Sequence, residues 1–372
     1  MKKFFSFMIL LLTAYPSSSQ FTLYRGNSVM EFSGYVTTFY NYRFYSEGET
    51  DKKKNRFALD YAVFRIDGVH KKVWNYQLQI NNAALFDKET SDGFIMQADV
   101  AYNTLNDRLS IDVGFNKVPF SRSSLIPNVE SPFLQRPQMA RGGVFNRRDA
   151  GVTLRYAVFN KLINLYAGAY TGMGPESLSG ENDESGNLEW AGRAELSYPA
   201  RYRHKEVDLT DIPLPVITVG FNARHAEKKT TSGIDYPYQT LKGKKLGYGS
   251  DVSAMWRGVT VSAEVLRFKM TPEESLLLYG KPTEYFMAGG VMVAINYYLK
   301  PLKSVLAVRY DEFNPHDLLK GDKEATLSFG YNYLFDSMRA AMKVHYFKRL
   351  KDEDAVKVWN EDQLRIALQL QF

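Results

Sequence analysis

The sequence has no cysteine and no long apolar segment beyond residue 12. Without cysteine, disulfide bonds cannot stabilise an exported fold. The mean hydropathy is −0.33, and no later run approaches the roughly 20 apolar residues of a transmembrane helix. If the chain crosses a membrane, it crosses as β-strands, and a closed strand ladder would supply the missing stability.

A strong charge imbalance is also absent. The formal net charge of +6 falls by two, to +4, when Lys2 and Lys3 are left out. The longest basic run is residues 52–54. This pattern does not indicate a nucleic-acid partner.

Motifs for catalysis and for phosphate-binding loops are missing as well. The sequence contains no Gly-x-Ser-x-Gly element and no glycine-rich turn that opens a helix. The histidines fall mostly in linkers or at strand ends, which favours ordinary surface histidines over catalytic ones; they are His70, His204, His225, His316 and His345. We therefore expect no enzyme activity, no cofactor and no metal site.

The N-terminus resembles a secretory signal peptide. Lys2 and Lys3 precede an apolar run over residues 4–12, and small residues stand at Ser17 and Ser19. A basic start, a short apolar run and small residues at the cleavage site are typical of exported proteins. We expect a signal peptide over residues 1–19, followed by one domain over residues 20–372.

The last stretch, residues 362–372, alternates strictly. Its apolar residues share one parity, and its polar residues, which include Arg365, share the other. Alternation of this kind predicts a strand with two different environments. A soluble sandwich would place the polar side in water, whereas an outer-membrane barrel would place the apolar side in lipid and the polar side in a wet lumen.

Similar stretches recur along the chain. We predict sixteen strands, at residues 29–44, 56–67, 74–81, 94–102, 109–115, 150–158, 163–171, 188–198, 216–224, 248–256, 259–268, 285–299, 303–311, 325–334, 339–347 and 362–372. Residues 21–27 are expected to form a short lead before the first strand. Glutamine and asparagine make the polar face of residues 74–81 unusually uniform for a soluble core.

The linkers between these strands alternate in length. Short turns are predicted at residues 106–108, 159–161, 257–258, 300–302 and 336–337, and the linkers between them are long and charged. Short periplasmic turns and long extracellular loops characterise an up-and-down transmembrane barrel, but not a sandwich. The long connection over residues 198–215 is the exception, because the pattern predicts a turn there. We expect an all-β, sixteen-stranded antiparallel outer-membrane barrel, whose lumen is too wide for side chains to fill and thus forms a channel.

Two motifs give the sequence a family resemblance. Residues 113–120 read Val-Gly-Phe-Asn-Lys-Val-Pro-Phe, and residues 146–154 read Asn-Arg-Arg-Asp-Ala-Gly-Val-Thr-Leu. They resemble the phosphate-selective porin O and P family, in which a Gly-x-x-Lys-x-Pro-Phe element, an inward-folding loop and an Arg-Asp-x-Gly strand start follow one another. The matching positions are Gly114, Lys117, Pro119, Phe120, Arg148, Asp149 and Gly151. The resemblance implies a trimeric outer-membrane channel that binds anions, and the terminal Phe372 resembles the signal read by the barrel-assembly machinery.

Residues 119–148 form the longest segment without a strand pattern, and such loops are usually functional or disordered. This segment carries five arginines, namely Arg122, Arg136, Arg141, Arg147 and Arg148, against one acid, Glu130. Folded into the lumen, these guanidiniums would create a positive constriction that pairs with phosphate or carboxylate. The alternative is a surface loop whose arginines contact lipopolysaccharide or a neighbouring subunit.

Strand parity places further basic residues on the lumen wall, because a charge facing lipid near the midplane costs about 2–4 kcal/mol. The wall residues singled out as candidate anion contacts are Arg155, Arg193, Arg224, Arg309, Lys343 and Arg365. Many of them can instead pair with lumen acids. Lys117 falls on the apolar parity at a strand end, where its side chain is expected to extend toward the rim or to turn with the bend at Pro119.

These residues together predict a porin that passes small hydrophilic solutes, with a preference for anions such as phosphate. The expected partners are outer-membrane lipid, lipopolysaccharide, small anionic solutes and two further copies of the chain. Two alternatives stay open, a barrel that anchors surface or secretion machinery without conducting and a barrel enzyme. Conductance of the purified protein in a planar bilayer separates the first of them from a porin.

Overall fold

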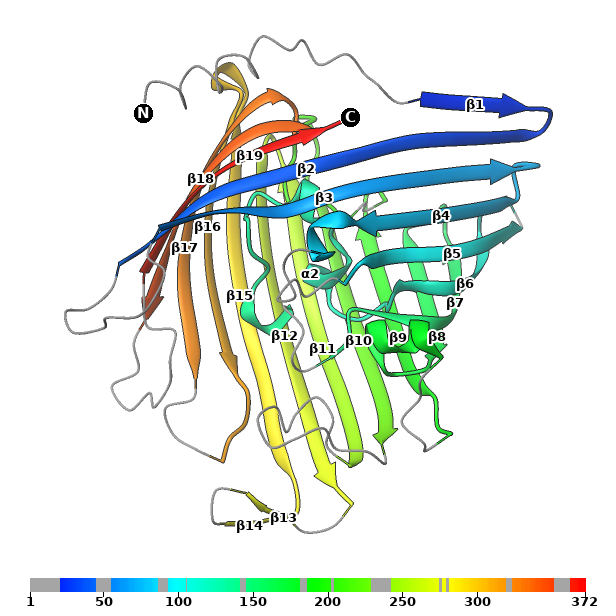
Figure 1. Ribbon diagram of the computed structural model, residues 1–372, viewed down its shortest axis with the longest axis vertical. Coiled ribbons are helices and arrows are strands. Elements are labelled where there is room, and N and C mark those ends of the chain that lie inside the picture. The colour runs from blue at the N-terminus through cyan, green and yellow to red at the C-terminus, as the bar shows by residue number, and fades with distance from the viewer. Residues whose placement is uncertain are drawn as a thin grey trace.

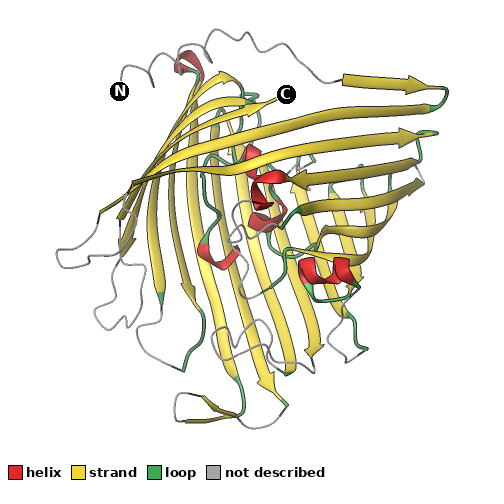
Figure 2. Cartoon of the chain, viewed as in Figure 1, coloured by secondary structure: helices red, strands yellow, loops and turns green. Residues whose placement is uncertain are grey.

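The computed structural model describes residues 21–44, 55–85, 93–104, 106–140, 145–180, 186–201, 204–228, 242–273, 276–278, 281–318, 323–350 and 362–372. The expected signal peptide over residues 1–19 lies outside these ranges. Within them, strands dominate and the helices are short (Figure 2). No helix in these ranges has the length and apolar character that a membrane span requires.

Sixteen antiparallel strands close into a barrel (Figure 1). They are β2 (Ser28–Phe44), β3 (Asn55–His70), β4 (Trp74–Asn81), β5 (Ile95–Thr104), β6 (Leu109–Lys117), β7 (Arg148–Val158), β8 (Ile163–Tyr170), β9 (Glu189–Tyr198), β10 (Val216–Lys228), β11 (Gly243–Trp256), β12 (Val259–Pro272), β15 (Phe286–Leu299), β16 (Ser304–Asn314), β17 (Glu324–Asp336), β18 (Ala340–Leu350) and β19 (Asp362–Gln371). Each strand pairs with the next, and the predicted sixteen-stranded barrel is confirmed.

The last strand closes the barrel against the first. β19 pairs with β2 from Asp362 opposite Phe44 to Gln371 opposite Tyr35. Backbone hydrogen bonds in both directions join Phe372 to Gly34, at 2.8 and 2.9 Å. The terminal strand therefore leaves no open sheet edge between the two ends of the barrel.

The lead expected over residues 21–27 is instead a strand. β1 (Phe21–Arg25) pairs with residues 28–32 at the start of β2. Leu23 lies opposite Met30, and the Phe21 ring lies 5.7 Å from that of Phe32. β1 and β19 thus pair with the same edge of β2, β1 with its first residues and β19 with its later ones.

The two faces of the barrel wall confirm the alternation read from the sequence. Val113 on β6 and its cross-strand neighbour Val152 on β7 are 51% and 43% exposed. The next pair along the same strands, Asp112 and Thr153, turns its side chains to the interior. Apolar residues face outward and polar residues inward, which is the pattern of a wall between lipid and a wet lumen.

The connections differ in length at the two rims. Three residues join β3 to β4, and two residues, Arg257 and Gly258, join β11 to β12. At the other rim the connections are longer, and the one between β12 and β15 includes a hairpin of β13 (Leu276–Leu278) and β14 (Lys281–Thr283). The short rim is the periplasmic one. The connection from β9 to β10 is the exception at that rim, as the sequence indicated, and no strand forms in its described part.

The helices of the described ranges are short, at three to six residues each. They are η1 (Asn82–Leu85), α2 (Arg122–Leu125), η2 (Asn128–Glu130), η3 (Gln138–Ala140), η4 (Gly174–Ser179) and η5 (Lys300–Leu302). Three of them, α2, η2 and η3, belong to the long connection from β6 to β7, which we call the inner segment (residues 118–147).

Candidate functional site

The inner segment contacts the lumen side of strands that lie far from it in the sequence. Ser123 donates from its backbone N–H and its hydroxyl to Glu264 on β12, at 3.0 and 2.5 Å. The backbone N–H of Gln138 donates to Asp311 on β16 at 2.8 Å. The segment therefore occupies the half of the lumen beside β10 to β19.

Aromatic packing anchors both ends of the inner segment. Phe120, near its start, and Phe145, near its end, lie with ring centroids 5.0 Å apart. Phe268 on β12 packs against both, at 5.5 and 5.7 Å. All three side chains are buried, so their apolar area holds the segment against this wall.

Two of the arginines predicted to form a positive constriction stabilise the segment itself. Arg122 is fully buried, and its Nη2 donates to the carbonyl of Lys205 at 2.9 Å. Arg136 donates to the carbonyls of Ser123 and Ile126, the latter at 2.7 Å. Both guanidiniums therefore use some of their N–H groups to donate to backbone carbonyls.

Three of the predicted wall residues donate hydrogen bonds from the barrel strands to the inner segment. Arg309 donates to the carbonyl of Gln135 at 2.8 Å and lies 4.4 Å from the ring centre of Phe133. Lys343 donates to the carbonyl of Ser131 at 2.9 Å. Arg224 pairs with Glu189 and also donates to the carbonyl of Asn146 at 2.7 Å. These cations are buried and support the backbone of the segment.

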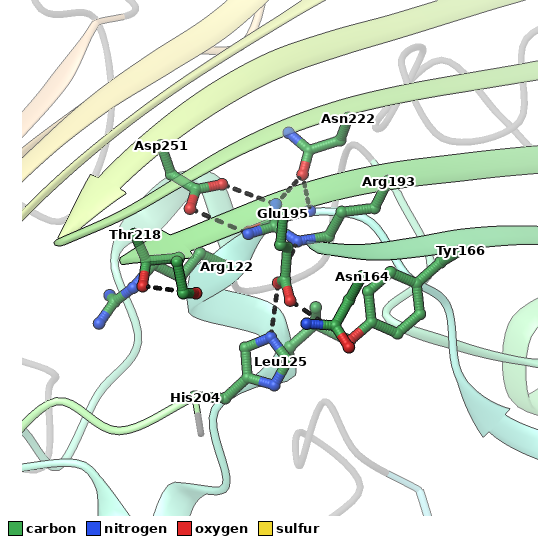
Figure 3. Close-up of polar contacts among 12 residues, drawn as sticks. Arg122, Leu125, Asn164, Tyr166, Arg193, Glu195, His204, Thr218, Asn222 and Asp251 are labelled. Atoms are coloured by element: carbon green, nitrogen blue, oxygen red, sulfur yellow. Dashed lines mark hydrogen bonds and ion pairs between the residues drawn. The ribbon is translucent and has the colours of Figure 1, made fainter. Parts of the chain in front are cut away.

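Arg193 and Arg365 belong to networks within the wall. Arg193 lies between Glu195 at 2.7 Å and Asp251 at 2.6 Å, as Figure 3 shows. Arg365 donates to Asn41 and Gln363, each at 3.1 Å. Both are buried, so their positive charges are compensated or shielded from the lumen.

Two cavities lie between the inner segment and the opposite wall. The first has a volume of about 360 Å³ and is lined by β2 to β8 together with the start of the inner segment. The second, of about 460 Å³, extends toward the short rim, where Asn164, Arg201 and His204 line it. Four residues line both cavities, namely Lys117, Leu125, Arg155 and Tyr166. The two cavities therefore meet between the inner segment and strands β7 and β8.

Arg155 stands at this junction, where its half-buried side chain lines both cavities. Its Nε–H has no hydrogen-bond partner among the residues that the structure describes. Asp112 acts on it electrostatically from the neighbouring strand β6. Because Arg155 lines both cavities while Arg122 and Arg136 line neither, Arg155 is better placed than these two to meet a passing anion.

The other predicted basic residues differ in position. Arg148, at the start of β7, is 7% exposed and lines the first cavity. Arg147 beside it is also buried. Arg141 lies outside the described residues, so its predicted role stays a prediction.

One of the two courses expected for Lys117 is excluded, because its side chain does not extend toward the rim. Its Nζ donates to the carbonyl of Leu125 at 2.7 Å and faces both cavities. The reason is Gly114, whose φ of +136° breaks the alternation of β6. Phe115, which counts as outward by parity, is consequently buried. Phe115 and Lys117 thus leave the outward face that a regular strand predicts for them, whereas Asn116 keeps its place in the lumen lining.

The family motif lies at the two ends of the inner segment. Gly114 and Gly151 are paired across β6 and β7, and Asn116 is paired with Asp149. A Cβ atom on Gly151 would lie 2.2 Å from the carbonyl oxygen of Ala169. Pro119 lines the first cavity at the bend that follows Lys117. The motif therefore sets where the chain leaves β6 and where it returns in β7.

Three cationic or titratable residues at the cavities were missed. Arg65 lines the first cavity, and Arg201 and His204 line the second. For Arg65 the cause is a bulge at Asp60, where the pairing of β2 with β3 shifts between Thr37 and Thr38. The extra residue shifts the inward and outward positions of β3, so alternation counted from the start of the strand misplaces Arg65. Alternation counted backward from the β3–β4 turn places Arg65 correctly, opposite Gln79.

The long connection from β9 to β10 turns into the barrel mouth. Val207 packs with Val305 and Leu334, and the Asp208 carboxylate accepts the backbone N–H groups of Ile212 and Gly258 at 2.9 and 3.0 Å. The connection also meets the inner segment, because Ser131 donates to Glu206 at 2.6 Å. His204 at its start pairs with Glu195 at 2.6 Å (Figure 3).

No group of three or more histidine, aspartate or glutamate side chains in the described ranges is arranged to hold a metal ion. His345 is fully buried, and its Nδ1 accepts the backbone N–H of Leu134 at 3.0 Å. His70 bonds to the Ser28 hydroxyl at 2.7 Å near the short rim.

Comparison with known families identifies part of the chain. Residues 33–211 match the family described as phosphate-selective porin O and P. This range contains both sequence motifs and the whole inner segment, and the family expected from the sequence is confirmed. A search of curated proteins found no match.

Solved structures share the fold over almost the whole chain. OmpT of Vibrio cholerae is 13% identical, with a TM-score of 0.60, and the match covers 95% of this chain and 100% of that one. An anion-selective porin from Comamonas acidovorans is 12% identical with a TM-score of 0.58, covering 93% and 100%. OmpF of Salmonella typhi, in complex with daunomycin, is 13% identical with a TM-score of 0.62, covering 95% and 100%. At these identities the likeness concerns the fold, which is that of an integral outer-membrane barrel.

Proposed function

Because residues 33–211 of this outer-membrane porin match the phosphate-selective porin O and P family, we propose that its diffusion channel prefers small anions such as phosphate. The observation that supports this preference most directly is Arg155. It stands where the two cavities meet and lines both of them. Lys117 adds a second positive charge across the junction.

The charges around the junction also favour anions over cations. Arg65, Arg148, Arg155 and Lys117 line the first cavity, and Asp112 is the acid among its lining residues. Arg65 pairs with Asp67, which reduces its contribution. A small excess of positive charge in a narrow aqueous passage recruits anions without holding them, as conduction requires.

The anion-selective porin from Comamonas acidovorans has the same fold, and the family description names phosphate. Both support an anion as the solute class. A homotrimer, which the resemblance implies, is part of the same proposal.

The test is the reversal potential of the purified protein in a planar bilayer between unequal KCl solutions. We expect the wild type to favour chloride over potassium. Arg155→Gln should lower the chloride-to-potassium permeability ratio by about threefold or more, because a unit charge near a passing ion contributes on the order of 1 kcal/mol even in a water-like medium.

Arg108→Gln is the matched control. Arg108 is exposed in the turn between β5 and β6 and lines neither cavity, so its loss should leave the ratio close to that of the wild type. A wild-type channel without anion preference would refute the proposal. An Arg155→Gln channel with an unchanged ratio would show that selectivity lies elsewhere in the lumen.

A further inference from the structure

The first cavity is lined by an unusual number of side-chain amides. The amide residues among its lining are Gln77, Gln79, Gln97, Asn116, Asn128 and Gln371. Five of these residues lie on β4, β5, β6 and β19, and the sixth lies in the inner segment. Amides both donate and accept hydrogen bonds, unlike the cations that an inorganic anion requires.

Strand register arranges three of these amides beside charged residues. Gln79 on β4 pairs with Arg65 on β3 and with Gln97 on β5. Two residues away on β4, Gln77 lies between Asp67 and Asp99. Its Nε2 donates to Asp67 at 2.8 Å, which fixes the plane of the amide. The wall thus presents donors and acceptors at fixed positions along neighbouring strands.

Several buried polar atoms of residues around this cavity lack hydrogen-bond partners within the described part of the chain. Asn116 is 3% exposed, and its amide oxygen has no hydrogen-bond partner within the described part of the chain. The same holds there for Oδ1 of Asp112 and for Nε of Arg155. All three residues line the cavity. The lining therefore includes residues that are not fully hydrogen-bonded within the described part of the chain.

We propose that the first cavity is a subsite for hydroxylated organic anions, such as sugar acids or hydroxylated sulfonates. The anionic group meets Arg155 and Lys117, while the hydroxyl groups meet the amides of Gln77 and Gln97. This inference rests on the proposed anion preference and adds the class of solute.

The cavity is expected to prefer hydroxylated anions because a chain without hydroxyl groups would leave the amides without hydrogen-bond partners. An alkyl chain displaces water from these amides and returns no hydrogen bonds, whereas a chain with hydroxyl groups replaces the bonds that the water made. A site built to bind hydroxyl groups therefore discriminates against analogues that lack them. The cavity of about 360 Å³ falls within the usual size of small-molecule sites, about 300–1,000 Å³.

The experiment compares two anions of equal charge and chain length, 2,3-dihydroxypropane-1-sulfonate and propane-1-sulfonate. Each is added at increasing concentration to single channels that conduct KCl, and the concentration that halves the chloride current is measured. We expect the dihydroxy anion to act at a concentration lower by about threefold or more, since each added hydrogen bond contributes modestly.

Two variants locate the effect. In the Gln77→Leu/Gln97→Leu double variant, the two sulfonates should act at nearly equal concentrations. Asn75→Leu is the matched control, because Asn75 lies two residues before Gln77 on the same face of β4 but outside the cavity lining. In Asn75→Leu, the dihydroxy anion should still act at a lower concentration than propane-1-sulfonate. Heat-dependent electrophoretic mobility shows whether each variant has folded.

The outcomes separate this inference from the proposed function. Equal half-blocking concentrations in an anion-preferring wild-type channel would overturn the hydroxylated-anion subsite and leave the anion preference in place. A difference that survives in the folded double variant would overturn the assignment to this cavity. A wild type without anion preference would remove the proposed function itself, whatever the sulfonates do.

Discussion

At the scale of single residues, Gly114 decides which side chains reach the channel. Its φ of +136° is a conformation that other residues rarely adopt. It turns Phe115 into the interior and lets Lys117 face the cavities. A Cβ atom at this position would lie 2.3 Å from the carbonyl oxygen of Ala98 on β5.

Gly114→Ala should therefore destabilise the barrel by about 1–3 kcal/mol, the usual cost of a residue held in a sparsely populated conformation. Gly192→Ala is the control, since a Cβ atom there would meet only the carbonyl oxygen of Tyr166 at 3.5 Å. Urea titration of both proteins folded in lipid vesicles measures the difference. Equal stability of the two variants would contradict the role given to Gly114.

At the scale of elements, the inner segment is fixed to one wall by hydrogen bonds from several strands. Glu264 on β12 accepts two of them from Ser123, and Lys343 on β18 donates to Ser131. Because these contacts hold the segment beside β10 to β19, the passage runs along β3 to β8. Loss of a charged partner leaves buried donors unpaired, at a cost of about 1–3 kcal/mol each.

Glu264→Ala should loosen the segment and give a noisier single-channel current with a changed mean conductance. Glu324→Ala is the control, because Glu324 is 44% exposed and pairs with Arg349 at 3.6 Å, away from the segment. Single-channel recordings in KCl make the comparison. Identical current noise and conductance in the two variants would mean that Glu264 does not position the segment.

At the scale of the whole molecule, the barrel is apolar outside and polar inside. Val113, in the middle of β6, faces outward and is 51% exposed, while the interior contains ion pairs such as Arg193 with Asp251. Hydrocarbon is the environment in which such an exterior is stable.

Val113→Arg should lower the stability of the folded barrel in lipid vesicles by about 2–4 kcal/mol, the cost of a cation near the bilayer midplane. Phe159→Arg is the comparison, since Phe159 is 74% exposed in the short turn between β7 and β8 and should cost about 0–1 kcal/mol. Urea titration in vesicles of defined lipid tests both. A Val113→Arg protein as stable as the wild type would place this face outside the membrane.

How far the sequence predicts the structure differs between wall and lumen. The boundaries of β4 were predicted to the residue, and most other strands within a few residues, because alternation is a local property of one stretch. The prediction failed where backbone irregularities shift the alternation, at the bulge at Asp60 and at Gly114. It also missed β1, whose five residues alone carry a weak pattern.

The sequence by itself determined that this chain forms a sixteen-stranded barrel with short turns at one rim, since each strand carries its own two-faced pattern. Only the tertiary structure decided which basic residues are open to a solute. Arg309 and Arg155 share the same parity signal, but Arg309 donates to a carbonyl 174 residues earlier in the chain, while Arg155 meets two cavities. The physical reason is that a guanidinium binds the nearest acceptor, and segments distant in sequence supply that acceptor.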